Sequence, residues 1–323
     1  MKSLVQMIAT MLFLISGQLS DGKAQPTSAA ITAMAFSASE SKLFVGSQAG
    51  LGWVFWKEKK QPIPIPTHLQ NMHHLALSPD EKQLAVAGGI PGELGMLEIW
   101  SLGKDLPPQR VEPHTDLIYE IAWSPDGSRI ATASADGTCC ICDVQTTNTV
   151  IRFSGHSRSV SAVGFLDNET VVSGGADGSL RIWNTNTGEV LRTLDNHTAS
   201  VTHLAMKPNA QAQSESRLIS ISDDRTARLW NPRIGRMIRF TKLPAKPRSM
   251  CWISAGNRIA IGLQNGTIQI FDAETLQEEA SYPGNVGVVY EIITSGEDAM
   301  MIVGGEKGLN SIELIDSHAK SLR

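Results

Sequence analysis

The apolar and polar positions of the chain follow one pattern that repeats between residues 114 and 231. Three copies begin at His114, His156 and His197, which are 42 and 41 residues apart. Each copy has an apolar segment, a turn with Pro or Asn, a second apolar segment, a turn with Asp, and a third segment that usually ends in an aromatic residue. Such short segments between turn residues predict β-strands. A period of 40–45 residues with about four strands is typical of one β-propeller blade.

The flanking sequence keeps this spacing. The third segments end at positions that are 44, 42, 41, 47, 41 and 44 residues apart, namely 56, 100, 142, 183, 230, 271 and 315. Seven units predict an all-β fold, a seven-bladed β-propeller of four-stranded antiparallel blades over residues 31–318. Closing the ring removes the free sheet edges of an open array. Either residues 25–30 or residues 317–323 are expected to supply the last outer strand.

Residues 1–24 have a different pattern. Lys2 precedes an apolar-rich stretch of twelve residues, 4–15, and small and polar residues follow. Gly22 and Ala24 fit the small residues that a signal peptidase requires before its cleavage site. A basic start, an apolar core of 7–15 residues and a small-residue exit predict a secretory signal peptide.

Two other interpretations fit this segment less well. A membrane anchor needs about 20 apolar residues, and a cytosolic propeller with an incidentally apolar N-terminus leaves the absence of a blade pattern unexplained. No Cys follows the apolar core, so the sequence does not predict a lipoprotein signal. We therefore expect an extracytoplasmic protein, periplasmic or secreted, without a transmembrane anchor.

The composition is that of a soluble globular protein, since 41% of the 323 residues are apolar, 19% are charged and the net charge is −4. A nucleic-acid-binding surface usually has a strong excess of basic residues. The negative balance therefore argues against nucleic acid as the main partner.

Three of the four cysteines lie in one predicted strand, Cys139-Cys140-Ile141-Cys142. Cys139 and Cys142 form a C-x-x-C pair, which elsewhere indicates redox or metal chemistry. On a strand, however, residues three apart point to opposite faces and lie roughly 10 Å apart, too far for a disulfide. We expect free thiols, and a redox role of this strand stays open.

The sequence lacks G-x-S-x-G, H-E-x-x-H and phosphate-loop motifs, which mark common catalytic sites. His73 and His74 are adjacent and face opposite ways on a strand, so we expect one in the core or between blades and one facing solvent. Of the innermost strands, only that of the fifth blade is expected to offer a channel residue, His203. No catalytic residue, metal or cofactor is predicted.

Positive charge concentrates near the junction of the fifth and sixth blades. The basic residues there are Arg233, Arg236, Arg239, Lys242, Lys246 and Arg248. One interpretation is a solvated edge strand that charge protects from pairing. The other is a patch for an acidic partner or an anionic surface.

The repeats resemble WD repeats over nearly all of residues 31–316. In that family a unit begins with Gly-His, as at Gly155-His156, carries Asp in the second hairpin, and ends its third strand with Trp-Asp. The resemblance implies a buried tetrad of His, Ser or Thr, Asp and Trp in each blade. The implied tetrads are His156, Ser173, Asp177 and Trp183 in the fourth blade, and His197, Ser220, Asp224 and Trp230 in the fifth.

Other blades depart from this pattern. The third blade keeps His114, Thr132 and Asp136 but has Cys142 in place of Trp, so its network is expected to lack the indole donor. The first, second, sixth and seventh blades lack a tetrad. A Gly-rich insertion at residues 88–95 resembles exported bacterial propellers, some of which carry cytochrome-like domains. The chain has no C-x-x-C-H haem attachment sequence, so no haem is implied.

We therefore expect a non-catalytic scaffold outside the cytoplasm that binds a protein or peptide through rim loops and the face around the channel. It would act as a monomer or as a subunit of a hetero-complex. One rival is a propeller enzyme with a central-channel site, lactonase-like or quinoprotein-like. In quinoproteins Trp follows a Thr-Gly turn, whereas Trp183 precedes Thr187-Gly188 here. A second rival is a structural subunit of an envelope complex.

Overall fold

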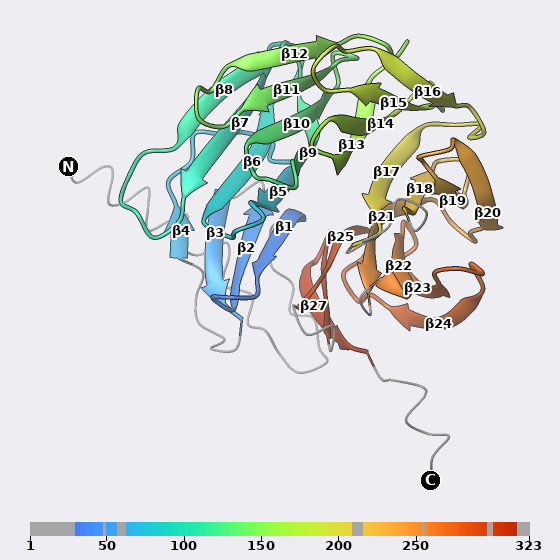
Figure 1. The fold of residues 1–323 in the computed structure, drawn as a ribbon. Coiled ribbons are helices and arrows are strands. Elements are labelled where there is room, and N and C mark those ends of the chain that lie inside the picture. Colours follow the sequence, from blue (N-terminus) through green and yellow to red (C-terminus); the bar gives the residue numbers. More distant parts are fainter. Residues whose placement is uncertain are drawn as a thin grey trace.

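The computed structural model describes residues 30–47, 50–56, 63–208, 216–253, 256–295 and 300–314. Their strands form seven sheets arranged as a ring (Figure 1). Six sheets have four antiparallel strands, and the seventh has three described strands. The predicted seven-bladed β-propeller is thereby confirmed. The predicted signal peptide, residue 318 and the candidate last outer strands, apart from residue 30, lie outside the described residues.

Each blade runs from a first, innermost strand to a last, outermost strand. The first three blades contain β1 (Ile31–Ser37), β2 (Lys42–Ser47), β3 (Gly50–Phe55) and β4 (Ile63–Ile65); β5 (His74–Leu77), β6 (Gln83–Ile90), β7 (Leu94–Ser101) and β8 (Gln109–His114); and β9 (Ile118–Trp123), β10 (Arg129–Ser134), β11 (Cys139–Asp143) and β12 (Thr149–Phe153). The fourth and fifth contain β13 (Val160–Asp167), β14 (Thr170–Gly175), β15 (Leu180–Asn184) and β16 (Val190–Leu194); and β17 (Val201–Met206), β18 (Leu218–Ser222), β19 (Thr226–Asn231) and β20 (Arg236–Lys242). The last two contain β21 (Pro247–Ile253), β22 (Arg258–Leu263), β23 (Thr267–Asp272) and β24 (Glu278–Pro283); and β25 (Val289–Thr294), β26 (Met300–Gly305) and β27 (Gly308–Glu313).

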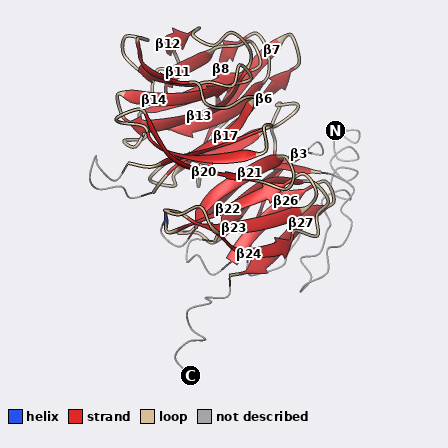
Figure 2. Cartoon of the chain, turned by 90° about the vertical axis from the view of Figure 1, so that its right-hand side faces the viewer, coloured by secondary structure: helices blue, strands red, loops and turns tan. Residues whose placement is uncertain are grey.

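The first strands of successive blades contact one another, and β25 of the last blade contacts β1 of the first. The ring is therefore closed by the packing of the seventh blade on the first. At this seam Ile31 and Met34 pack with Ile302. Figure 2 shows the same molecule turned by 90°, with the sheets stacked against one another and joined by loops.

The second strand of each blade is buried on both faces. In β10, β14, β22 and β26 every residue after the first is buried. This explains why these strands read as runs of small and apolar residues rather than as strict alternation, since both faces of a blade pack on neighbouring blades. Burial of each large apolar side chain contributes about 1.5–3 kcal/mol.

Aromatic residues link neighbouring blades both near the outer strands and near the innermost strands. Trp183 on β15 is fully buried and stacks on Phe153 of β12, with ring centroids 4.7 Å apart and planes at 10°. Trp123 on β9 donates its indole N–H to Ala76 O of the preceding blade at 3.0 Å. Large rings thus fill the space between blades and use their polar atoms there.

Candidate functional sites: blade networks, channel ring and outer strand

A chain of hydrogen bonds runs through the fourth blade. Trp183 donates its indole N–H to Ser173 Oγ on β14 at 3.2 Å, and His156 Nε2 lies 2.8 Å from the same oxygen. His156 lies in the loop after β12, and its Nδ1 is 3.1 Å from Asp177 Oδ1 in the β14–β15 turn. Since an indole only donates and a carboxylate only accepts, the chain runs from Trp through Ser and His to Asp.

The environment fixes the ionisation of this network. Burial lowers the pKa of His156 in spite of the adjacent carboxylate. Burial alone would raise the pKa of Asp177, but hydrogen bonds from Ser179, from the Ser157 amide and from His156 hold it well below its usual range. A neutral imidazole and an ionised carboxylate, both buried and mutually bonded, support a structural role for the network.

The fifth blade repeats this arrangement. Trp230 on β19 donates to Ser220 Oγ on β18 at 2.9 Å, and His197 Nε2 lies 2.8 Å from that oxygen. His197 Nδ1 lies 2.8 Å from Asp224 Oδ2. In both blades the His comes from the loop that joins two blades, so the network ties each loop to the sheet that follows it.

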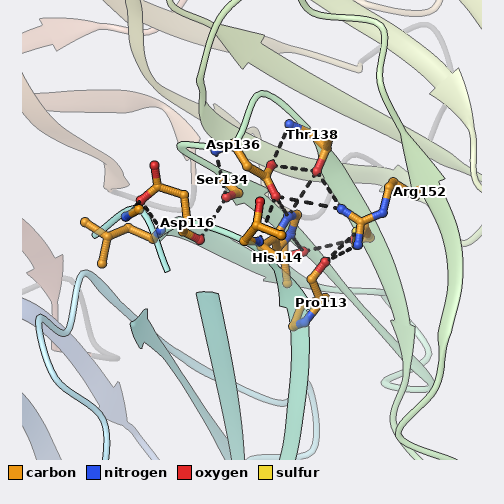
Figure 3. Close-up of polar contacts among 12 residues, drawn as sticks. Pro113, His114, Asp116, Ser134, Asp136, Thr138 and Arg152 are labelled. Carbon is orange, nitrogen blue, oxygen red and sulfur yellow. Dashed lines mark hydrogen bonds and ion pairs between the residues drawn. The ribbon is translucent and has the colours of Figure 1, made fainter. Parts of the chain in front are cut away.

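The third blade contains a shorter network (Figure 3). His114 at the end of β8 places Nε2 2.7 Å from Thr132 Oγ1 and Nδ1 3.0 Å from Asp136 Oδ2. Cys142 is buried on β11, paired with Ile130 rather than bonded to Thr132. No indole among the described residues reaches Thr132 in this blade, and its Oγ1 lies 3.3 Å from the Cys140 carbonyl oxygen.

Arg152 on β12 contacts this network on its solvent-facing side. Its guanidinium donates to Thr138 Oγ1 at 3.1 Å and to the Pro113 carbonyl, and Nη1 lies 3.8 Å from Asp136 Oδ2 (Figure 3). The side chain of Arg152 is 45% exposed, so this contact is a solvent-screened ion pair of modest energy.

The four cysteines of the chain are free thiols, as predicted. Cys139, Cys140 and Cys142 are fully buried. Burial raises the pKa of Cys140 and of Cys142 to about 12. Because the thiolate is the reactive form, these side chains behave as small apolar residues of the core.

The channel contains more ionisable groups than the sequence analysis predicted. Four of them occupy the same position on their innermost strands: His74 on β5, Glu120 on β9, His203 on β17 and Glu291 on β25. In each blade this residue pairs with the corresponding residue of the second strand, as Glu120 does with Ala133 and Glu291 with Gly304. We call these four residues the channel ring.

The expectation that only His203 would face the channel was therefore wrong. In β9, β17 and β25 the ring residue follows a β-bulge, which adds one residue to the strand and changes the phase of the alternation. Of the adjacent histidines, one was expected in the core or between blades, and His73 does contact the next blade; the expectation that the other faces solvent was wrong, because both are partly buried. His73 packs edge-on against Tyr119, with ring centroids 5.4 Å apart.

The groups of the channel ring are electrostatically coupled. Glu120 Oε1 lies 3.2 Å from His203 Nδ1, and its Oε2 accepts from the Val163 amide at 3.3 Å. Burial alone would lower the pKa of His203, but Glu120 raises it to about 9. Burial raises the pKa of Glu291 to about 7. At neutral pH the ring therefore holds one ion pair and a carboxyl group that is close to its titration midpoint.

His74 completes the channel ring. Its imidazole centroid is 6.5 Å from that of His203, and its Nδ1 is buried without a hydrogen-bond partner among the described residues. Burial lowers the pKa of His74 to about 4, so the imidazole is neutral at physiological pH. Across the described ranges, no three His, Cys, Asp or Glu side chains are arranged to hold a metal ion.

The structure divides the predicted basic patch into two groups. Arg233 lies 2.5 Å from Asp167 of the fourth blade, while Lys246 and Arg248 lie 3.5 and 3.6 Å from Asp223. These three cations have carboxylate partners within the molecule, and Lys246 and Arg248 share one carboxylate. The second group, Arg236, Arg239 and Lys242, is exposed on β20.

Two parts of the chain match protein families. A family profile described as the anaphase-promoting complex subunit 4 WD40 domain matches residues 93–168. A second, the WD domain, G-beta repeat, matches residues 188–231. Together with the seven-bladed fold, these matches support a WD-repeat β-propeller.

Three eukaryotic relatives illustrate the breadth of this class. Telomerase protein component 1 of Mus musculus is 23% identical over 60% of this chain and 8% of its own length. The p21-activated protein kinase-interacting protein 1-like of Danio rerio is 24% identical over 57% of this chain and 48% of its own. The guanine nucleotide-binding protein subunit beta of Saccharomyces cerevisiae is 23% identical over 66% of this chain and 51% of its own.

This chain thus spans about half of the length of the last two relatives and less than a tenth of the first. In the part of the chain that the structure describes, no helix has the length and apolar character needed to cross a membrane.

Proposed function

We propose that this propeller is a non-catalytic scaffold that binds another protein or a peptide, in keeping with the protein-interaction role typical of WD-repeat propellers. The observation that carries the proposal is the exposure of apolar side chains on the outermost strands of three successive blades. These side chains are Val150 on β12, Val190 and Leu191 on β16, and Ile238 and Phe240 on β20. Exposed apolar residues gathered on one region of a surface are typical of interaction sites.

The test is chemical crosslinking of the tagged full chain in its native extract, followed by identification of crosslinked peptides. Leu191→Ser and Phe240→Ser should abolish the crosslink to a recurrent protein partner. Glu120→Gln, a channel variant, should leave it unchanged. Loss of the partner with the channel variant alone would instead place binding in the channel.

We propose further that the chain is exported and acts outside the cytoplasm. This proposal is supported by the sequence of residues 1–24 alone, and the eukaryotic relatives do not support the resemblance to exported bacterial proteins. Expression of the full chain with a C-terminal tag in a bacterium tests it. A periplasmic product that begins at Gln25 would support export, whereas an intact cytoplasmic product would contradict it.

A second candidate function is a reaction in the central channel, and the channel ring is the observation that favours it. A carboxyl group that titrates near neutrality is suited to general acid–base catalysis. Hydrolysis of lactones by the wild-type chain, lost in Glu291→Gln, would support this candidate.

A structural subunit of an envelope complex would differ from the scaffold and from the channel enzyme in having one permanent partner.

A further inference from the structure

The outermost strand of the fifth blade, β20, is the last strand of its sheet and pairs on one side only, with β19. Among the described residues, no strand pairs with its other edge. β20 has seven residues, whereas the outermost strands of the first, third and fourth blades have three, five and five. A long strand of this kind offers a row of free backbone N–H and C=O groups.

Among the described residues, the cations of β20 have no acidic partner. No carboxylate within the described ranges forms an ion pair with Arg236, Arg239 or Lys242. The outermost strand of the next blade, β24, begins instead with the exposed acidic residues Glu278 and Glu279. The outermost strands β12 and β16 carry one exposed Arg each, Arg152 and Arg192, so the cluster of three cations distinguishes β20 from them.

Apolar side chains lie between these cations. Phe240 is 52% exposed and Ile238 is 37% exposed. The guanidinium of Arg228 on β19 lies 5.6 Å from the Phe240 ring centroid, which holds one face of the ring against the sheet. Charge alone accounts for the protection of an edge strand, but it does not account for an exposed Phe and Ile on the same strand.

The pairing register assigns these side chains to faces. Phe240 is opposite Arg228, and Arg239 is opposite Leu229. Since directly paired residues share a face and successive residues alternate, the two faces of the β20 edge differ. One presents the aromatic ring of Phe240 together with Lys242, and the other presents the charges of Arg239 and of Arg236, whose partner Asn231 lies two residues after Leu229.

We propose that β20 binds an extended acidic segment of a partner protein, in which carboxylate residues alternate with apolar residues, as an added strand along its free edge. The proposal rests on the scaffold function proposed above and identifies its surface and its ligand chemistry. Backbone hydrogen bonds would supply affinity and alternate side chains would supply specificity, as in other cases of strand addition. Carboxylates would align with Arg239 and apolar side chains with Phe240.

The direct test is a fluorescence anisotropy titration of the full chain with a labelled peptide of about ten residues that alternates Glu and Val. We expect saturable binding that weakens at least about tenfold in the double variant Arg236→Glu/Arg239→Glu, which reverses the charge of the face that would meet the carboxylates, given typical losses at interface hot spots. The charge-matched control is Lys104→Glu/Arg158→Glu, because Lys104 and Arg158 are exposed elsewhere on the ring. This control should bind like the wild type.

Two further peptides separate strand addition from general charge attraction. A peptide of the same composition with all Glu residues at one end should bind at least about tenfold more weakly, as should the alternating peptide with every second amide N-methylated. Equal binding of all three peptides would overturn the proposal. So would vesicles of about 30% phosphatidylserine that bind the wild type in a β20-dependent manner while the alternating peptide does not.

The crosslinking experiment separates this inference from the proposed function. A protein partner that remains crosslinked to Arg236→Glu/Arg239→Glu would overturn the role of β20 and leave the scaffold function intact. Absence of any protein partner, together with binding of the alternating peptide, would contradict the scaffold function and keep the strand-addition site.

Discussion

At the scale of single residues, Trp183 contributes to the fourth blade in two separable ways. Its indole N–H donates to Ser173, and its ring stacks on Phe153. The first contribution depends on one hydrogen atom and the second on the shape of the ring. Phe at this position keeps part of the stacking surface and removes the donor.

We expect Trp183→Phe to lower the free energy of unfolding by about 1–3 kcal/mol, because it removes a buried hydrogen bond and reduces the ring volume. Urea denaturation is the measurement. A double-mutant cycle with Ser173→Ala isolates the hydrogen bond, and we expect a coupling energy of about 1 kcal/mol. A coupling near zero would show that the indole contributes only through packing.

The ion pair of the channel ring predicts a dependence of stability on pH. Glu120 raises the pKa of His203 from its ordinary 6.5 to about 9. A folded-state pKa above the unfolded value gives stabilisation that is complete below pH 6.5 and is lost as the pH rises through 9. We expect the free energy of unfolding to fall by roughly 1–3 kcal/mol between pH 6.5 and 9.

Urea denaturation across that pH window, with Glu120→Gln as the control, tests this expectation. The Gln variant lacks the charge that raises the pKa of His203, so its stability should vary less above pH 7. His74 and Glu291 also face His203, and burial raises the pKa of Glu291 to about 7. Glu291 therefore contributes a loss of the same sign below pH 7, which is smaller in the Gln variant because Glu120 also raises the pKa of Glu291. Parallel curves for the two proteins would contradict the assigned role of Glu120.

At the scale of strands and blades, close packing between blades limits side-chain size. Gly174 on β14 faces β17 of the next blade, and a Cβ at this position would lie 2.7 Å from Val201 Cγ1. Gly46 on β2 is its counterpart in the first blade, since Gly46 pairs with Ala33 as Gly174 pairs with Ala162. A Cβ at Gly46 would have only ordinary contacts, of 3.5 Å or more.

We expect Gly174→Ala to destabilise the protein by about 1–3 kcal/mol, because the added methyl group overpacks the contact between two blades. Gly46→Ala should be neutral or slightly stabilising, since Ala loses less conformational freedom on folding than Gly. Thermal unfolding of both variants is the measurement. Equal changes in the two variants would show that the distance to Val201 does not limit this site.

The number of blades was predictable from the sequence, but the channel ring was not. The spacing of apolar segments and turns predicted seven blades, because every blade repeats the same local pattern. Glu120 and Glu291 of the channel ring were missed because the bulges in β9 and β25 shift the alternation that identifies inward-facing residues. Alignment of the innermost strands by their pairing partners would have placed Glu120 and His203 at one level.

The division of the basic patch was not predictable from local sequence. Asp167, which neutralises Arg233, lies 66 residues earlier in the chain and comes from another blade. Only the packing of the fourth blade on the fifth brings the two side chains together. By contrast, the free cations of β20 lie within one strand, and their alternation with Ile238 and Phe240 can be read directly from the sequence.

At the scale of the whole molecule, closure of the ring makes every blade depend on two neighbours. In an open array, each terminal repeat has a neighbour on one side and can unfold separately. Here Ile302 of the seventh blade is fully buried against Ile31 and Met34 of the first. The seam joins the two ends of the described chain by apolar packing, so its strength decides whether the seven blades unfold together.

We expect Ile302→Ala to lower stability by about 2–5 kcal/mol through the cavity that it leaves, and to lower the midpoint of one cooperative transition in differential scanning calorimetry. Val172→Ala on β14, a buried position away from the seam, is the control and should shift the same transition by a smaller amount, since it removes less apolar volume. A separate low-temperature transition in the seam variant alone would show that the first and seventh blades can open while the remaining blades stay folded. A single transition in both variants would mean that neighbouring blades hold the ring together even when its seam is weakened, which is the rigidity that a docking strand such as β20 requires.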